Sequence, residues 1–157
     1  MARHTLLGAV QAALAAEHAA VYGYGIVGAR VAGELAERAQ QAYDAHRARR
    51  DALRRTVGDL GGEPVAAEPA YALPFEVPDG TTAVRLAAEL EDRVAGVYAD
   101  LVRAAAADLR RDAADALREA AVRAVRWRGG SVAFPGLAER SRPATETVEH
   151  QEGRTPT

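Results

Sequence analysis

Cysteine and lysine are both absent from this sequence of 157 residues, and each absence excludes something. Without cysteine there is no disulfide framework, no thiolate nucleophile and no zinc-finger spacing. All 20 basic residues are therefore arginine, which suits fixed, partly buried ion pairs better than lysine does. The 22 acidic residues bring the net charge to −2, and no basic stripe alternates with aromatic residues. The sequence thus predicts no nucleic-acid partner.

Long apolar runs are absent as well. No stretch approaches the roughly 18 to 20 apolar residues of a transmembrane helix, so we expect no membrane partner. The opening stretch, MARHTLLGAVQAALAA, does have the basic start, apolar middle and Ala-Leu-Ala of a cleavable signal peptide. However, Gln11 interrupts the apolar part, and the helical pattern continues through Glu17 to Val27. This favours a first helix over a cleaved signal and predicts a cytoplasmic protein.

The alternating pattern of β-strands is missing too, whereas apolar residues recur at helical spacing in four long segments. These segments cover about residues 5–28, 33–60, 82–105 and 108–128. Thr81 or Thr82 is expected to cap the third helix. Residues Gly61 and Gly62 end the second helix. The buried side of the fourth helix is expected to centre on Leu117, Ala121, Ala124 and Val125.

The connection lengths predict how these helices are joined. Short links within the first and second pairs indicate two antiparallel hairpins. The stretch between the hairpins, GGEPVAAEPAYALPFEVPDG, has too many prolines for a helix and is too apolar for a free linker. It is long enough to cross the bundle from end to end, with Tyr71, Leu73 and Phe75 packed on the helices. Two hairpins joined by one long crossover form the ferritin-like four-helix topology, so the sequence predicts an all-α bundle over residues 1–137.

The last segments of the chain differ in composition from the bundle. SVAFPGL is expected to fold back over one end, with Trp127 packed against AFPGL. Residues 138–157, AERSRPATETVEHQEGRTPT, are polar and rich in proline, threonine and glutamate, so we expect a disordered tail.

Three of the predicted inward faces carry one titratable residue near the middle of the helix: Glu17, His46 and Glu91. A charged group inside a bundle is costly unless it is paired or bound to a cation. Since all three lie at a similar depth, we expect them to form one site. His18 lies beside the inward stripe and is expected at a helix interface or at the surface. The glycines of YGYGIVG are expected to allow close helix packing, because the phosphate-loop setting is missing.

Several stretches resemble the actinobacterial ferritin-like domain family of unknown function (DUF4439 type). They are LAAEHAAVYGYGIVGAR, AYDAHRARRDAL, AYALPF, LEDRVAGVY and AFPGL. The resemblance covers residues 5–137 and implies a ferritin-like fold. Diiron members of that superfamily hold their metals with one Glu from each of two helices and Glu-x-x-His from each of the others.

Carried onto this chain, that ligand set is incomplete. Glu17 and Glu91 match the two single glutamates, and His46 matches one histidine. Tyr43 stands where the Glu before His46 would be. Glu119 on the fourth helix lacks its histidine and is expected to face solvent. The remaining residues are too few to hold two metals, so no cofactor is expected.

Three interpretations of the site remain open. In the first, Glu17 and Glu91 form a buried polar cluster with Arg50, His46 and Tyr43, and the guanidinium replaces a metal. In the second, Arg50 extends to the surface and the acids are half exposed. In the third, Glu17, His46 and Glu91 hold a single ion, iron or another divalent metal.

The function classes follow from these interpretations. No complete catalytic set is present, so the sequence favours a non-enzymatic structural or protein-interaction module. We expect a homodimer packed through an outer face of the first two helices, where alanine and glycine permit close approach, and a protein partner whose identity the sequence does not give. The alternative is a metal- or small-molecule-binding domain with at most a mononuclear site.

Overall fold

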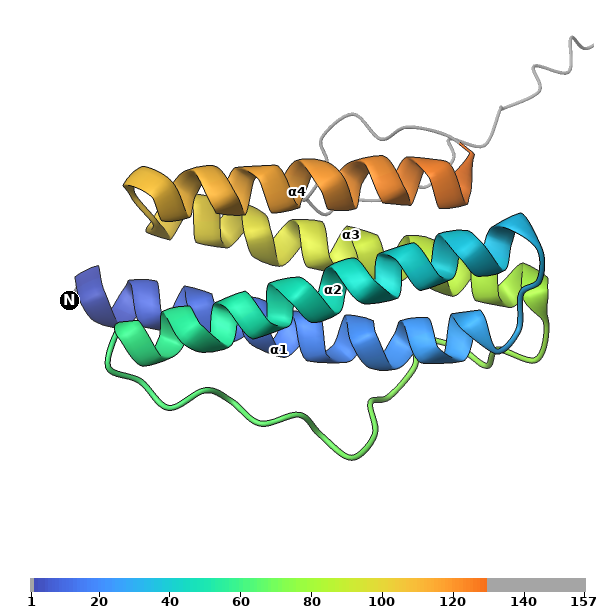
Figure 1. Cartoon of the computed structure of the whole chain (residues 1–157), viewed down its shortest axis with the longest axis horizontal. Helices are drawn as coiled ribbons and strands as arrows, with labels where there is room; N and C mark the ends of the chain where they lie inside the picture. The colour runs from blue at the N-terminus through green and yellow to red at the C-terminus, as the bar shows by residue number, and fades with distance from the viewer. Residues whose placement is uncertain (1, 130–157) are drawn as a thin grey trace, which may run out of the picture.

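The structure is a computed structural model that describes residues 2–129, and this part of the chain contains four helices and no strand. The helices are α1 (Ala2–Gly28), α2 (Glu34–Asp59), α3 (Gly80–Ala104) and α4 (Ala107–Arg128). Figure 1 shows them lying side by side as an elongated bundle. The predicted all-α four-helix bundle is confirmed, and the predicted helix ends differ from the observed ones by a few residues.

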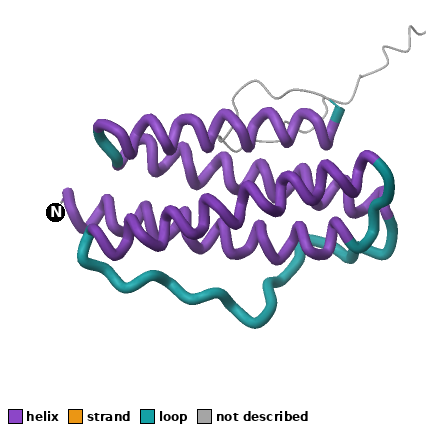
Figure 2. The backbone as a smooth tube through the Cα atoms, viewed as in Figure 1, coloured by secondary structure: helices purple, strands orange, loops and turns teal. Residues whose placement is uncertain are grey.

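The chain path is two hairpins joined by a long crossover, as predicted. Helices α1 and α4 run in one direction and α2 and α3 in the other (Figure 1). The segment from α2 to α3 runs along the outside of the bundle from one end to the other (Figure 2). Helix α1 packs closely on α2 and on α3, and α3 packs on α4. Helices α2 and α4 approach each other less closely, and the Arg49–Glu119 ion pair bridges them.

The crossover is held against α1 by specific contacts. The Gln11 side chain accepts a hydrogen bond from Val65 N at 3.0 Å. His18 Nε2 lies 3.1 Å from Val65 O, which places this buried side chain at an interface, as expected. The rings of Tyr22 and Tyr71 meet with their centroids 5.5 Å apart. These three contacts hold the crossover along one side of α1.

The start of α3 differs from the prediction in the identity of its cap. Asp79 is the N-cap, and its side chain accepts a 2.8 Å hydrogen bond from Thr82 N. Thr82 in turn accepts a 3.3 Å bond from Asp79 N, which completes a capping box. The predicted caps, Thr81 and Thr82, therefore lie inside the helix. A carboxylate also suits this position because it faces the positive end of the helix dipole.

The core consists of two apolar clusters. One includes Val10, Leu14, Leu53, Val57 and Leu101, and the other includes Tyr24, Val27, Ala42, Leu86 and Trp127. His46 and Glu91 lie at helix positions between those of the two clusters, and Glu17 lies between Leu14 and Ala20 of the first cluster, so a polar layer crosses the core. The helices α1 and α3 also approach closely at Gly23. A Cβ atom there would lie 2.5 Å from Leu90 Cδ1, which supports the predicted close packing at Gly23, whereas Gly25 and Gly28 have nothing within 4 Å of such an atom.

The buried face of α4 differs from the predicted one. The buried residues are Ala113, Ala116, Ala120, Ala124 and Trp127. Leu117, Ala121 and Val125, predicted to be central, are only half-buried. The small alanines of α4 allow it to pack closely on α3, and the larger Leu117 and Val125 lie at the edge of that contact.

The predictions for the end of the chain fall on residues that the structure does not describe. The segment SVAFPGL, the boundary at residue 137 and the predicted tail 138–157 lie outside the described residues. Within residues 2–129, no helix has the length and apolarity that crossing a membrane requires.

Candidate functional site: a buried carboxylate–imidazole layer

Three titratable side chains meet in the middle of the bundle. Glu17 of α1, His46 of α2 and Glu91 of α3 each have no exposed surface. His46 Nδ1 lies 2.6 Å from Glu17 Oε2, and His46 Nε2 lies 3.1 Å from Glu91 Oε1. The imidazole therefore bridges the two carboxylates, and both of its nitrogens are engaged.

Each carboxylate also accepts a hydrogen bond from a buried tyrosine. Tyr98 Oη on α3 donates to Glu17 Oε1 on α1 over 2.6 Å. Tyr24 Oη on α1 donates to Glu91 Oε1 on α3, also over 2.6 Å. In both helices the tyrosine follows the glutamate by two turns, and α1 and α3 are antiparallel (Figure 1). This arrangement places each tyrosine beside the glutamate of the opposite helix.

Helix α4 supplies the fourth side of the layer. Arg123 Nε donates to Glu91 Oε1 over 2.8 Å, and the Arg123 side chain keeps 16% of its surface exposed. Trp127 Nε1 donates to Tyr24 Oη over 2.8 Å. The Tyr24 ring also stacks on the His46 ring, with centroids 5.3 Å apart. All four helices thus contribute to one continuous hydrogen-bonded network.

The protonation state of His46 follows from its two neighbours. Burial disfavours the charged imidazolium, but the hydrogen bonds and charges of Glu17 and Glu91 outweigh it and raise the pKa of His46 to about 9. At neutral pH the ring is therefore an imidazolium that donates through both nitrogens. Burial, reinforced by a neighbouring carboxylate, raises the pKa of Tyr24 and of Tyr98 far above the usual range. Both phenols consequently remain neutral donors.

The charges of the layer balance within the chain. Two carboxylates, Glu17 and Glu91, face two cations, His46 and Arg123. One polar atom is the exception. Glu91 Oε2 is buried and has no hydrogen-bond partner among the described residues. A buried acceptor without a partner is uncommon, so it marks a position where a water molecule or another donor fits.

The structure does not bring Arg50 into the layer, contrary to the preferred sequence interpretation. Arg50 pairs instead with the neighbouring Asp51, its Nη2 lying 2.8 Å from Asp51 Oδ1, and both side chains are partly exposed. Tyr43 is also outside the layer. Its ring packs on the apolar cluster, and the Arg47 guanidinium lies 5.6 Å from its centroid. The reason is geometric: Arg50 is one turn beyond His46, and its long side chain reaches the helix edge.

Glu119 also differs from its prediction as a solvent-facing acid. Its carboxylate lies 2.7 Å from Arg49 Nη2 and 3.8 Å from Arg123 Nη1, so it bridges α2 and α4. The side chain keeps 44% of its surface exposed. Glu119 thus helps to position Arg123, the cation that the layer uses, while remaining at the edge of the bundle.

Sequence reasoning missed Arg123, and it did not assign Tyr24 and Tyr98 to the site. A signal for the tyrosines exists, because Glu17–Tyr24 and Glu91–Tyr98 have the same spacing on helices predicted to face each other. For Arg123 the available signal is weaker. It lies four residues after Glu119, which makes an intrahelical pair, but the mistaken rotation of α4 hid its inward direction.

The donor set does not fit a dinuclear metal centre. Only Glu17, His46 and Glu91 of the expected ligands are present, and His46 uses both nitrogens on carboxylates. A metal-bound histidine needs one nitrogen with a free lone pair. Among residues 2–129, no three or more His, Cys, Asp or Glu side chains are arranged so that they surround one ion.

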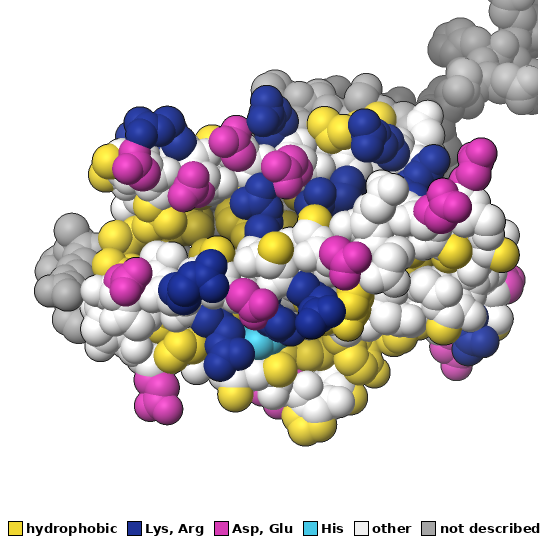
Figure 3. All heavy atoms as spheres, in the orientation of Figure 1, with side chains coloured by type: hydrophobic (Ala, Val, Ile, Leu, Met, Phe, Trp, Pro, Cys, Tyr) yellow, Lys and Arg dark blue, Asp and Glu magenta, His cyan; other side chains and the backbone are white. Residues whose placement is uncertain are grey.

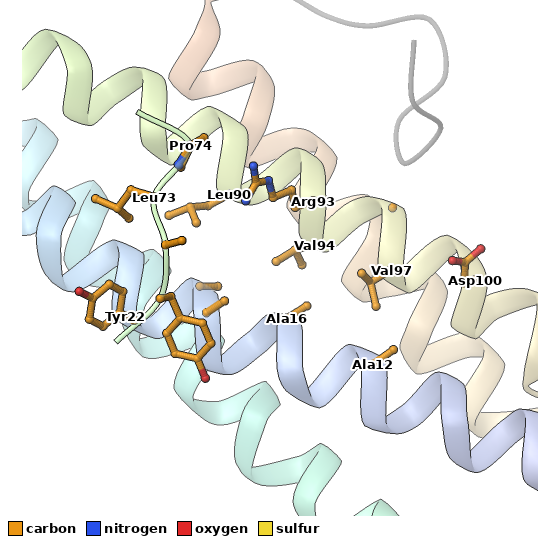
Figure 4. Close-up of a pocket in the computed structure, with 15 residues that line it drawn as sticks. Ala12, Ala16, Tyr22, Leu73, Pro74, Leu90, Arg93, Val94, Val97 and Asp100 are labelled. Atoms are coloured by element: carbon orange, nitrogen blue, oxygen red, sulfur yellow. The ribbon is translucent and has the colours of Figure 1, made fainter. Parts of the chain in front are cut away.

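A second feature, an apolar groove, lies between α1 and α3. It has a volume of about 520 Å³, and one end is closed by the crossover at Leu73 and Pro74. Figure 4 shows small side chains of α1, such as Ala12 and Ala16, on one wall and Val97 of α3 on the other. The charged residues at its rim are Arg93 and Asp100, both on α3.

Comparisons with known proteins agree with the fold. A family model described as "Domain of unknown function (DUF4439)" matches residues 9–139. Among solved structures, a conserved hypothetical protein of Mycobacterium tuberculosis is similar, with a TM-score of 0.78 and 36% sequence identity. The match covers 80% of this chain and 96% of that chain. No curated protein matches this chain.

Proposed function

The chain belongs to the DUF4439 family, a domain of unknown function, and from that premise we propose that it is a non-catalytic, ferritin-like bundle that acts by association with a second copy. The proposal rests chiefly on the self-contained charge balance of the polar layer. His46 and Arg123 neutralise Glu17 and Glu91, so the layer needs no metal to be stable. As part of the same proposal, the protein works in the cytoplasm.

The ferritin-like assignment is supported by the order of the helices. Two antiparallel hairpins joined by a crossover that spans the bundle characterise ferritin-like folds. In such folds the facing helices carry metal ligands at mid-bundle. Here an imidazolium lies between two carboxylates at mid-bundle, and a guanidinium contacts one of them, which supports a site in which cationic side chains take the place of a metal.

Rather than at the outer face of the first two helices that the sequence suggested, we place this association at the groove between α1 and α3. Its small side chains permit close backbone approach, and its lining is predominantly apolar. The rim charges are self-complementary. Arg93 and Asp100 lie two turns apart on α3, so a twofold axis that places the two α3 helices antiparallel sets each Arg93 against the partner's Asp100. Within the chain these residues form only exposed pairs with Glu89 and Arg103, which are easily exchanged.

The mass of the protein in solution tests this proposal. Light scattering at micromolar concentration should give a dimer, and Ala12→Glu, which places a charge in the groove at an exposed position, should give a monomer. The matched control is Val122→Glu on α4, which adds the same charge at an exposed apolar residue outside the groove. A monomeric wild-type protein, or equal effects of the two variants, would contradict the association.

One observation favours a second function, the binding of a single metal ion. Glu91 Oε2 is buried without a hydrogen-bond partner among the described residues and lies in the same carboxylate that contacts His46. In this alternative, Glu17, His46 and Glu91 rearrange to hold iron or another divalent ion. Elemental analysis of protein purified without added metal separates the two functions. The proposed function predicts less than a tenth of an equivalent of metal, and the alternative predicts close to one equivalent that Glu91→Gln removes.

A further inference from the structure

The side of the bundle between α2 and α4 contains a small basic pocket at the edge of the polar layer. Figure 3 shows dark-blue arginine side chains gathered between α4, at the top of the view, and α2 below it. The pocket has a volume of about 110 Å³ and is lined by Arg38, Gln41, Ala42, Arg123, Arg126 and Trp127. This lining, taken among the described residues, contains no acidic side chain.

The arginine side chains of this pocket differ in whether they have an acidic partner. Arg123 is paired with Glu91, at 2.8 Å. Arg38 and Arg126 have no acidic partner within residues 2–129. The pocket therefore carries two uncompensated positive charges from Arg38 and Arg126, next to a third guanidinium whose charge is already balanced.

Arg38 is held in position before any ligand arrives. Its guanidinium carbon lies 5.3 Å from the centre of the Trp127 ring, and its Nη1 donates to Arg126 O over 3.2 Å. Trp127 is itself fixed by its hydrogen bond to Tyr24. A donor that is already oriented loses less conformational entropy on binding. The pocket is thus an organised group of donors rather than a loose surface cluster.

We propose that this pocket binds the phosphate group of a small anionic ligand, with Arg38 and Arg126 as its charged partners and Gln41 as a further donor. A phosphate monoester carries close to two negative charges at neutral pH, which equals the charge that the two arginines leave uncompensated. The planar guanidinium matches phosphate oxygens with paired hydrogen bonds. The available volume corresponds to about four water molecules of ~30 Å³ each, which is enough for one phosphate group.

The site is independent of the proposed self-association, because its residues lie on α2 and α4 and the groove lies between α1 and α3. It also borders the polar layer. Arg123 lines the pocket and donates to Glu91, while Trp127 lines the pocket and donates to Tyr24. An anion in the pocket therefore lies one side chain away from Glu91.

The chain carries its own reporter for this site, because Trp127 is the only tryptophan. The experiment is a titration of the full chain with inorganic phosphate at constant ionic strength, followed by tryptophan fluorescence and by isothermal calorimetry, with chloride as the reference anion. The expected result is a saturable fluorescence change with phosphate and none with chloride. A linear or absent response to phosphate, or an equal response to chloride, would overturn the proposal.

Two variants and one control locate the binding. Arg126→Gln is at an exposed position, so it should leave the fold intact and weaken phosphate binding about tenfold or more, as expected for the loss of a charge-assisted hydrogen bond. Arg38→Gln should do the same. Arg118→Gln removes an equal charge from the same helix outside the pocket and should leave phosphate binding unchanged. Equal weakening by all three variants would show general charge attraction and would refute the site.

Discussion

Tyr98 on α3 donates a 2.6 Å hydrogen bond to Glu17 on α1, and Tyr24 on α1 returns the same bond to Glu91 on α3. Both helices carry a tyrosine two turns after the glutamate, and because α1 and α3 are antiparallel, each tyrosine lies beside the glutamate of the other helix. They join the two carboxylates from opposite directions, with His46 between them. The helices α1 and α3 are thereby aligned along their length by polar groups, in addition to the apolar contacts on either side.

Removal of either phenol should destabilise the bundle by about 1 to 3 kcal/mol, because a buried carboxylate then lacks one donor. Tyr98→Phe and Tyr24→Phe test this by urea unfolding. Tyr22→Phe is the matched control, since Tyr22 contacts the Tyr71 ring and is not among the residues hydrogen-bonded in the layer. If Tyr22→Phe lowers the free energy of unfolding as much as the other two variants do, the hydrogen bonds to the carboxylates are not the cause of the destabilisation.

Arg123, rather than Arg50, should be the arginine on which the layer depends. Arg123→Met leaves Glu91 with a buried charge that His46 alone balances in part, and the free energy of unfolding should fall by about 3 kcal/mol. Arg50→Met removes an exposed pair with Asp51 and should change it by less than about 1 kcal/mol.

A double-mutant cycle with Glu91 checks this assignment. Glu91→Gln combined with Arg123→Met should recover part of the loss, because neither charge then lacks its partner. If the effects of the single changes add without coupling, Arg123 does not act through Glu91.

The stability of the protein should decrease as the pH rises above neutrality. The pKa of His46 is about 9 in the folded protein, compared with 6.5 for an ordinary histidine, so the folded state binds the proton more tightly. This contribution is fully present below about pH 6.5 and is lost as the pH rises through 9, with a total on the order of 3 kcal/mol. Urea unfolding from pH 6 to 10 measures it, and His46→Gln should lose most of this pH dependence. A wild-type profile as flat as that of the variant would contradict a protonated His46.

The close approach of α1 to α3 predicts opposite effects at two nearby glycines. Gly23→Ala introduces a Cβ that would meet Leu90, so the gain in helix propensity should be offset by crowding of about 1 kcal/mol or more. Gly25→Ala has nothing within 4 Å of the new atom and should stabilise the protein by up to about 1 kcal/mol. Thermal unfolding compares the two, and equal stabilisation would mean that Leu90 moves aside freely.

Much of this architecture was predictable from local patterns. The 3.6-residue period of apolar positions identified the four helices, and the inward positions of Glu17, His46 and Glu91 followed from the same period. The proline-rich segment predicted the crossover because proline excludes helix there. These features depend on residues close together in the chain, so they can be predicted from the local sequence without knowledge of tertiary contacts.

The partners of the carboxylates depended on the tertiary structure. Arg50 of α2 pairs with Asp51, whereas Arg123 of α4 meets Glu91, so the arginine that reaches the layer depends on how α2 and α4 pack. Helix α4 packs through its alanines rather than through Leu117 and Val125, and this rotation turns Arg123 toward the layer. The exchange of tyrosine bonds between α1 and α3 likewise requires the relative shift of two helices along their axes. Such distances between elements are set by the fit of side chains across the core, because no single segment of sequence encodes them.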